Sequence, residues 1–140
     1  MVDREKIERR LEKLEQAVRK LKEIASYSWE KYYQDEGLKD RAERNLQLAA
    51  QACIDLANHL IADLGLRAPL TYAESFAVLS EEGIIPSDLA RTMQKIAGFR
   101  NILVHDYLEI DQQIVYAMLN NLQDFEEFAQ CIFRVLKEEG

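Results

Sequence analysis

The residues best suited to chemistry stand together in one short segment, positions 100–107, which reads Arg-Asn-Ile-Leu-Val-His-Asp-Tyr. An arginine can hold a phosphate through its planar fork of N–H donors at any pH. A histidine can give or take a proton near neutrality. Arg100 and His105 together offer charge stabilisation and proton transfer, which are the two functions that cleavage of a phosphodiester without a metal requires. We therefore expect the chemistry of this chain to lie at this segment.

Spacing along a helix does not by itself make Arg100 and His105 partners. On a straight helix, at about 100° per residue, the two residues point roughly 140° apart. Asn101 shares a face with His105, whereas Arg100 lies nearly over Tyr107. Three arrangements would still unite the arginine with the histidine: the helix unwinds near Val104, the long arginine wraps around the helix, or two copies of the segment meet in a dimer. We favour a helix end at the segment combined with a dimer.

The composition is that of a soluble globular chain, which we expect to form a single domain over residues 1–140. This length suits one domain with a substantial core. Apolar residues at 48% and charged residues at 31% leave no compositional case for disorder. No uninterrupted apolar run approaches a membrane span, and the first ten residues are charged rather than an apolar signal core. We expect a cytoplasmic protein with no membrane contact.

The net charge of −7 argues against a protein that coats nucleic acid, because such binding is driven largely by lysine and arginine neutralising phosphates. Transient contact at one small basic site stays open. The doublets Arg9-Arg10 and Arg19-Lys20 stand among glutamates on the polar side of the first predicted helix, so a solvated, salt-bridged face is the simpler interpretation.

The two cysteines give no sign of a metal site. Cys53 and Cys131 stand far apart inside helical apolar patterns, with no C-x-x-C pair and no nearby histidine spacing. We expect both to be reduced, buried thiols. The sequence predicts neither a metal nor another cofactor.

Hydrophobic periodicity predicts an all-α fold, an antiparallel bundle of about five helices. The first helix has an apolar stripe and is long, continuing to an end at Gly37. The third is short and opens at a T-x-x-E capping box, Thr71 to Glu74. Asp111 is placed to cap the last. The expected helices begin at about residues 3, 38, 71, 87 and 111, and the last reaches about residue 136.

Four glycines test this division of the chain. Gly37, Gly65 and Gly83 fall at predicted helix ends, where a left-handed residue is common. Gly98 lies inside a predicted helix, two residues before Arg100, where glycine costs close to 1 kcal/mol against alanine. A tight helix crossing would explain it, and the crossing could lie within the chain or between two subunits.

The pattern arginine, four residues, histidine, one residue, tyrosine, which runs from Arg100 to Tyr107, resembles the signature of the HEPN superfamily. The likeness is strongest to its HepT-type toxins, which are partners of minimal nucleotidyltransferase antitoxins. It extends to the size of the chain, the two long N-terminal helices and the long helix after the motif. The resemblance implies a helical bundle that dimerises with its motifs facing one another and a metal-independent ribonuclease in the shared cleft.

The resemblance also implies a role for each motif residue. Arg100 would bind the scissile phosphate and stabilise its developing charge, and His105 would be the general base or acid. Asn101 would orient the histidine or the substrate, with Asp106 as a second supporting residue. Tyr107 matches the tyrosine that the antitoxin modifies with AMP, which would fill the cleft and neutralise the arginine. The implied partners are a second copy, the antitoxin and an RNA, either tRNA or mRNA.

Other interpretations stay open at this stage. The motif surface could belong to a noncatalytic module that binds a nucleotide or a partner enzyme, which the acidic net charge favours. A helical scaffold without a ligand fits the coiled-coil-like first helix but leaves the motif unexplained. Arg100 could also pair with Asp106 or with a carboxylate from another helix. The aromatic residues Trp29, Tyr32 and Tyr33 are expected in the core.

Overall fold

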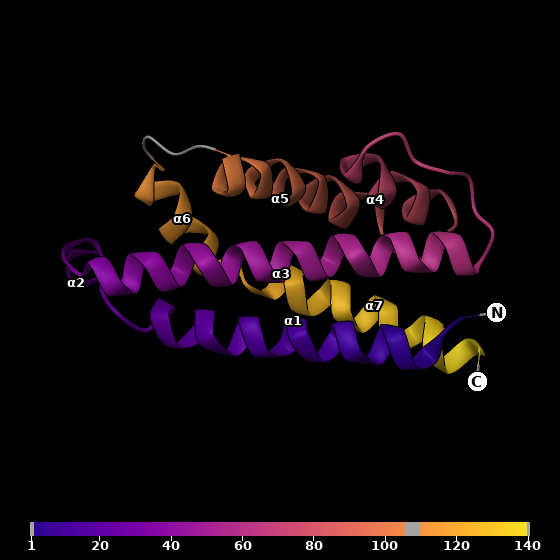
Figure 1. Cartoon of the computed structure of the whole chain (residues 1–140), viewed down its shortest axis with the longest axis horizontal. Helices are drawn as coiled ribbons and strands as arrows, with labels where there is room; N and C mark the ends of the chain where they lie inside the picture. The colour runs from indigo at the N-terminus through magenta and orange to yellow at the C-terminus, as the bar shows by residue number, and fades with distance from the viewer. Residues whose placement is uncertain (1, 106–109, 140) are drawn as a thin grey trace.

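The computed structural model describes residues 2–105 and 110–139, except for the side chains of residues 104 and 105. Every regular element in these residues is a helix, so the all-α prediction is confirmed. The long helices α1 and α3 lie side by side, α4 and α5 cover the other side of α3, and α7 runs behind (Figure 1). The helices are α1(Arg4–Ala25), α2(Trp29–Gln34), α3(Glu36–Asp63), α4(Tyr72–Glu81), α5(Ser87–His105), α6(Gln112–Leu119) and α7(Gln123–Glu139).

The prediction of one long first helix ending at Gly37 is wrong, because two capping residues start new helices inside that range. Ser28 Oγ accepts a hydrogen bond from the amide of Lys31 at 3.2 Å and opens α2. Asp35 then opens α3, with its carboxylate accepting from the amide of Leu38 at 3.1 Å. Gly37 lies in the first turn of α3, where an added Cβ would stand 3.2 Å from the Asp35 carboxylate. The glycine thus leaves room for the cap.

The predicted last helix is also divided, into α6 and α7. Asp111 caps α6 as predicted, its carboxylate accepting from the amide of Gln113 at 2.9 Å. At the far end, the Asn121 side chain donates to the carbonyl of Ala117 at 2.9 Å. Such local bonds from asparagine compete with helix continuation. The described residues therefore form seven helices rather than about five.

The other predicted boundaries are confirmed. Gly65 and Gly83 have left-handed backbones, with φ of 65° and 71°, and follow α3 and α4. Thr71 Oγ1 accepts from the amide of Glu74 at 3.0 Å and caps the short α4. Pro86 precedes α5, the helix that carries the motif.

A continuous apolar core joins the seven helices. The rings of Phe76 on α4 and Phe128 on α7 meet edge to face with centroids 5.6 Å apart. Cys53 and Cys131 are free and buried, as predicted, and burial raises the pKa of both thiols. Among the described helices, none combines the length and apolarity that a bilayer span requires.

Candidate functional site

Residues 100–105 of the motif form the last described turns of α5. The backbone stays helical through His105, so unwinding at Val104 does not bring the histidine round to Arg100. Their backbone positions therefore stay roughly 140° apart around the axis. The side chain of His105, and Asp106 and Tyr107 as a whole, lie outside the described residues.

The Arg100 guanidinium is half-buried and oriented by two neighbours. Its Nη1 donates a hydrogen bond to the Asn101 side-chain oxygen at 3.1 Å. Its Cζ lies 5.9 Å from the centroid of the Tyr72 ring, which is at the start of α4. A cation at such a distance from an aromatic ring is attracted by about 0.5–1 kcal/mol at exposed sites. Asn101, expected to orient the histidine or the substrate, thus contacts Arg100 in this structure, and Tyr72 is a neighbour that sequence spacing does not indicate.

The charge of Arg100 is not neutralised within the described part of the chain. No carboxylate there forms an ion pair with it, and its buried Nε has no hydrogen-bond partner among those residues. An ion pair with a carboxylate from another described helix is therefore excluded. A half-buried, uncompensated guanidinium with a spare donor is suited to hold an anion such as a phosphate.

The start of α4, and with it Tyr72, is fixed by a network around Arg67. Its guanidinium binds Glu81 through two hydrogen bonds, at 2.7 and 2.9 Å, and Glu74 through one at 2.6 Å. Glu74 also accepts from the amide of Leu70 at 2.8 Å. The hydrogen bonds from Arg67 lower the pKa of both carboxyl groups. This network links the loop after α3 to both ends of α4.

On the other side of the motif, the start of α6 is anchored to α2 and α3. The buried Tyr32 hydroxyl donates to Gln112 Oε1 at 2.5 Å, and Gln112 Nε2 donates to Glu43 at 2.7 Å. Burial, and then the charge of Glu43, raises the pKa of Tyr32. Trp29 packs against the core as expected, whereas Tyr33 is 50% exposed, so the core prediction is wrong for that residue. These contacts hold the start of α6, the first described helix after the motif.

An apolar groove of about 680 Å³ lies beside the motif, between α5, α6 and α7. Ile102, within the motif, and Ile114, on α6, line it and are 47% and 48% exposed. Gly98 lies in the same wall, and a Cβ added to it would meet no heavy atom within 4 Å. The predicted tight crossing at Gly98 is therefore wrong for the described part of this chain. A crossing with a second subunit stays a prediction.

The described residues outside the motif form no candidate metal site. Among them, no group of three or more His, Cys, Asp or Glu side chains is placed to hold a metal ion. His59, the other histidine, lies half-buried on α3. Among the described residues, Arg100 near the end of α5 is therefore the candidate site.

Known proteins share the fold of this helical chain, and a family model matches most of its sequence. Its fold is that of a HEPN toxin: it superposes with a TM-score of 0.86 on the tri-AMPylated HEPN toxin of Shewanella oneidensis, solved in complex with an MNT antitoxin. That match has 31% identity and covers 96% of this chain and 99% of the other. Residues 14–132 match the family described as Ribonuclease HepT-like. The chain belongs to this family, and the HEPN resemblance inferred from the motif is confirmed.

Two relatives show what family members do. The chain is 38% identical over 102 residues to the mRNA nuclease HepT of Shewanella oneidensis, covering 72% of this chain and 77% of that protein. It is 32% identical over 127 residues to the tRNA nuclease HepT of Aphanizomenon flos-aquae, covering 90% and 86%. The relatives thus act on two different classes of RNA.

Proposed function

We propose that this chain is a ribonuclease toxin that cleaves RNA with Arg100 and His105 and without a metal. The observation that carries the proposal is the guanidinium of Arg100, oriented by Asn101 and Tyr72 and left without a counter-charge in the described residues. The mRNA and tRNA nucleases among its relatives support RNA as the substrate.

The proposed reaction is an attack by the ribose 2′-hydroxyl on the adjacent phosphorus. The O2′–P bond forms and the bond from phosphorus to the 5′-oxygen breaks, which leaves a 2′,3′-cyclic phosphate and a 5′-hydroxyl. His105 removes the proton of the 2′-hydroxyl or donates one to the leaving oxygen. Arg100 binds the non-bridging oxygens, where negative charge develops, through its N–H donors. Asn101 and Asp106 support these two residues, and Asn101 does so by its hydrogen bond to the arginine.

The active form in this proposal is a homodimer that meets at the groove between α5, α6 and α7. Two observations support it. The backbone positions of Arg100 and His105 diverge around α5, so a second copy offers a way for an arginine and a histidine to face one phosphate. The groove beside the motif exposes Ile102 and Ile114, and the uncrowded Gly98 leaves room for another helix. Apolar surface of this kind is commonly covered by a partner.

The proposed regulator is a nucleotidyltransferase antitoxin that attaches AMP to Tyr107. The structural relative from Shewanella oneidensis is a tri-AMPylated toxin bound to an MNT antitoxin, which supports both the partner and the modification. Each added AMP brings a phosphate, and a phosphate close to Arg100 would occupy the donors that the substrate needs. Modification would therefore silence the nuclease.

Growth of bacteria that express the chain tests the proposal. Induction of the unmodified chain alone should arrest growth, and the His105→Ala and Arg100→Ala variants at equal abundance should not. Coexpression of the cognate nucleotidyltransferase should restore growth. Equal, harmless growth with the unmodified chain and both variants would favour a noncatalytic binding module instead.

A further inference from the structure

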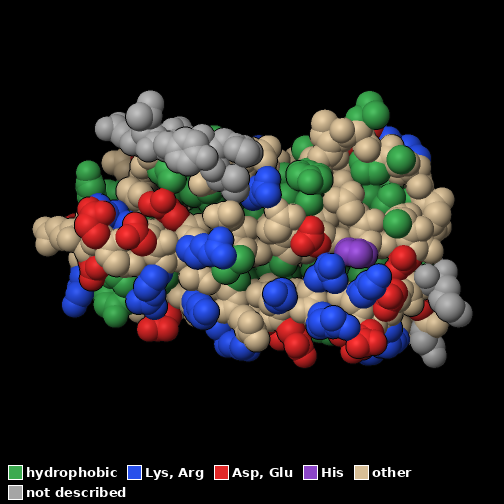
Figure 2. Space-filling model, viewed as in Figure 1, with side chains coloured by type: hydrophobic (Ala, Val, Ile, Leu, Met, Phe, Trp, Pro, Cys, Tyr) green, Lys and Arg blue, Asp and Glu red, His purple; other side chains and the backbone are tan. Residues whose placement is uncertain are grey.

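A second groove, of about 270 Å³, runs between α1 and α3. Arg10, Lys13 and Lys20 line its α1 wall, and Gln51 and Asp55 line its α3 wall. The spacing of the three basic residues puts them on one stripe of α1 that is about 15 Å long. Figure 2 shows Lys and Arg side chains gathered over α1 and along its border with α3.

The basic residues of this groove form no ion pair with the residues that the structure describes. The sequence predicts a salt-bridged polar face on α1, and Arg9 does pair with Glu5 at 2.9 Å. No ion pair within the described residues involves Arg10, Lys13 or Lys20. Asp55 is the one carboxylate in the lining, and it accepts a hydrogen bond from the Gln51 amide at 2.8 Å. The groove therefore carries a local excess of positive charge on a chain with a net charge of −7.

Both walls also hold polar atoms whose hydrogen-bonding capacity is unused. Arg10 donates from Nη1 to the carbonyl of Lys6 at 3.2 Å, but its buried Nε has no partner among the described residues. The Gln51 side-chain oxygen across the groove is likewise buried without one in that part of the chain. Buried polar groups are normally paired. A small rotation of these two side chains would turn a donor and an acceptor toward a ligand in the groove.

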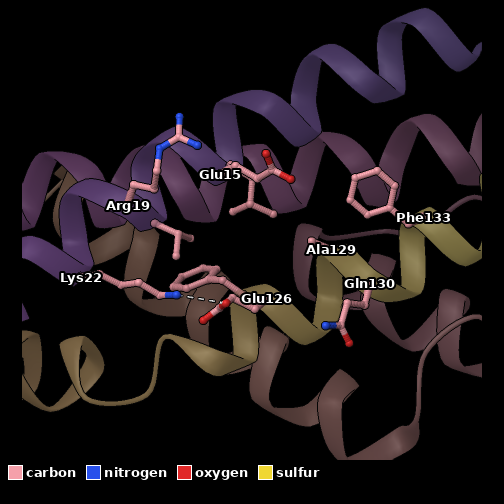
Figure 3. Close-up of a pocket in the computed structure, with 10 residues that line it drawn as sticks. Glu15, Arg19, Lys22, Glu126, Ala129, Gln130 and Phe133 are labelled. Carbon is pink, nitrogen blue, oxygen red and sulfur yellow. Dashed lines mark hydrogen bonds and ion pairs between the residues drawn. The ribbon is translucent and has the colours of Figure 1, made fainter.

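The groove on the opposite side of α1 is different in charge. There Lys22 pairs with Glu126 of α7 at 3.1 Å, and Glu15 and Arg19 lie in the same lining (Figure 3). Basic and acidic groups therefore alternate in the α1/α7 groove. The unpaired cations of the α1/α3 groove are a particular feature of that surface and not a property of α1 as a whole.

We infer that the α1/α3 groove binds the sugar-phosphate backbone of single-stranded RNA beyond the site of cleavage. The inference rests on the proposed function, because RNA is the polyanion that the proposed nuclease would bind. A chain with a net negative charge repels RNA except where cations are concentrated. Helix α3 contacts both α1 and α5, so the groove and the helix that carries Arg100 lie on two sides of the same helix (Figure 1). Leu48, which is 41% exposed in the groove, offers apolar surface to a base.

The test is binding of a fluorescent single-stranded oligoribonucleotide to His105→Ala protein, titrated at several salt concentrations. The double variant R10Q/K13Q should bind about 10-fold more weakly at moderate salt. The plot of the logarithm of the association constant against the logarithm of the salt concentration should also become less steep, by ~1.4, since each phosphate contact contributes about 0.7 to its negative slope. The matched control, R19Q/K22Q, removes the same residue types at the same spacing from the opposite side of α1. It should change binding far less. Asp55→Asn should tighten binding.

Cleavage by the protein with His105 intact, measured in parallel, separates this inference from the proposed function. If that protein cleaves RNA but R10Q/K13Q binds RNA as tightly as R19Q/K22Q, the groove inference is overturned and the nuclease stands. If it cleaves no RNA but R10Q/K13Q still binds selectively more weakly, the groove inference stands and the nuclease fails. Equal melting temperatures of the two double variants would show that neither effect comes from unfolding.

Discussion

At the scale of single residues, the geometry of Arg100 is set by neighbours on its own helix and on α4. Asn101 holds one guanidinium nitrogen, and the ring of Tyr72 faces the cation. A planar guanidinium that is already oriented loses less entropy when it binds a phosphate. We therefore propose a positioning role for Tyr72 beside the roles proposed for the motif residues.

Removing the Tyr72 ring should weaken catalysis without removing the catalytic groups. Because an exposed cation–π contact is worth about 0.5–1 kcal/mol, Tyr72→Ala should lower kcat/KM on RNA roughly 2-fold to 5-fold. Tyr72→Phe keeps the ring and should stay close to the unsubstituted protein. Initial-rate measurements with both variants check this. Equal losses in the alanine and phenylalanine variants would show that the ring does not orient Arg100.

At the scale of elements, the start of α6 depends on the hydroxyl of Tyr32. Tyr32→Phe removes the donor to Gln112, so the free energy of unfolding should fall by about 1 kcal/mol. Urea denaturation measures this change. Tyr33→Phe is the control, because Tyr33 stands beside it in the chain and is half-exposed. A change as large in the control would argue against the proposed anchor.

The loop before α4 should become less stable in acid, because Arg67 holds the pKa of Glu74 and Glu81 below the ordinary value. A carboxyl group with a lowered pKa in the folded state contributes stability above its unfolded pKa, about 4.3 for glutamate. That contribution is lost as the pH falls through the lowered values. The melting temperature should therefore drop in this acidic range, and the drop should be shallower in Arg67→Gln. Identical acid profiles in the two proteins would contradict the role given to Arg67.

The sequence predicts the helical content and most boundaries, but not the two breaks inside long periodic patterns. The apolar stripe continues in phase across Ser28 and Asn121, so periodicity cannot show that local hydrogen bonds from these side chains interrupt the helix. The prediction of a helix end at Gly37 is wrong because glycine is common at a helix end and also fits beside a capping carboxylate. At the site, the motif predicts Arg100 and Asn101, whereas Tyr72 is distant in the chain and gives no sequence signal.

At the scale of the whole molecule, the proposed active form needs a second copy that covers the groove beside the motif. Ile102→Asp and Ile114→Asp each place a charge in an exposed apolar position, which should leave the fold intact and oppose burial by a partner. Both variants should shift toward the monomer in sedimentation velocity and should lose RNA cleavage.

Phe133→Asp on α7 is the matched control for this prediction. Phe133 is 45% exposed, close to the values for the two isoleucines, and lies at the α1/α7 groove. It should keep the oligomeric state and the activity. If all three variants sediment like the unsubstituted protein, the groove is not the dimer interface.

In the proposed mechanism, an arginine and a histidine of this motif cleave RNA without a metal. The most direct measurement is the cleavage of single-stranded RNA by purified protein in EDTA, with analysis of the product ends. We predict 2′,3′-cyclic phosphate ends with the unsubstituted protein, and a loss of about 10²-fold or more in rate for Arg100→Ala and for His105→Ala at unchanged melting temperature. Full activity in both variants, or activity that EDTA abolishes in the unsubstituted protein, would contradict the claim.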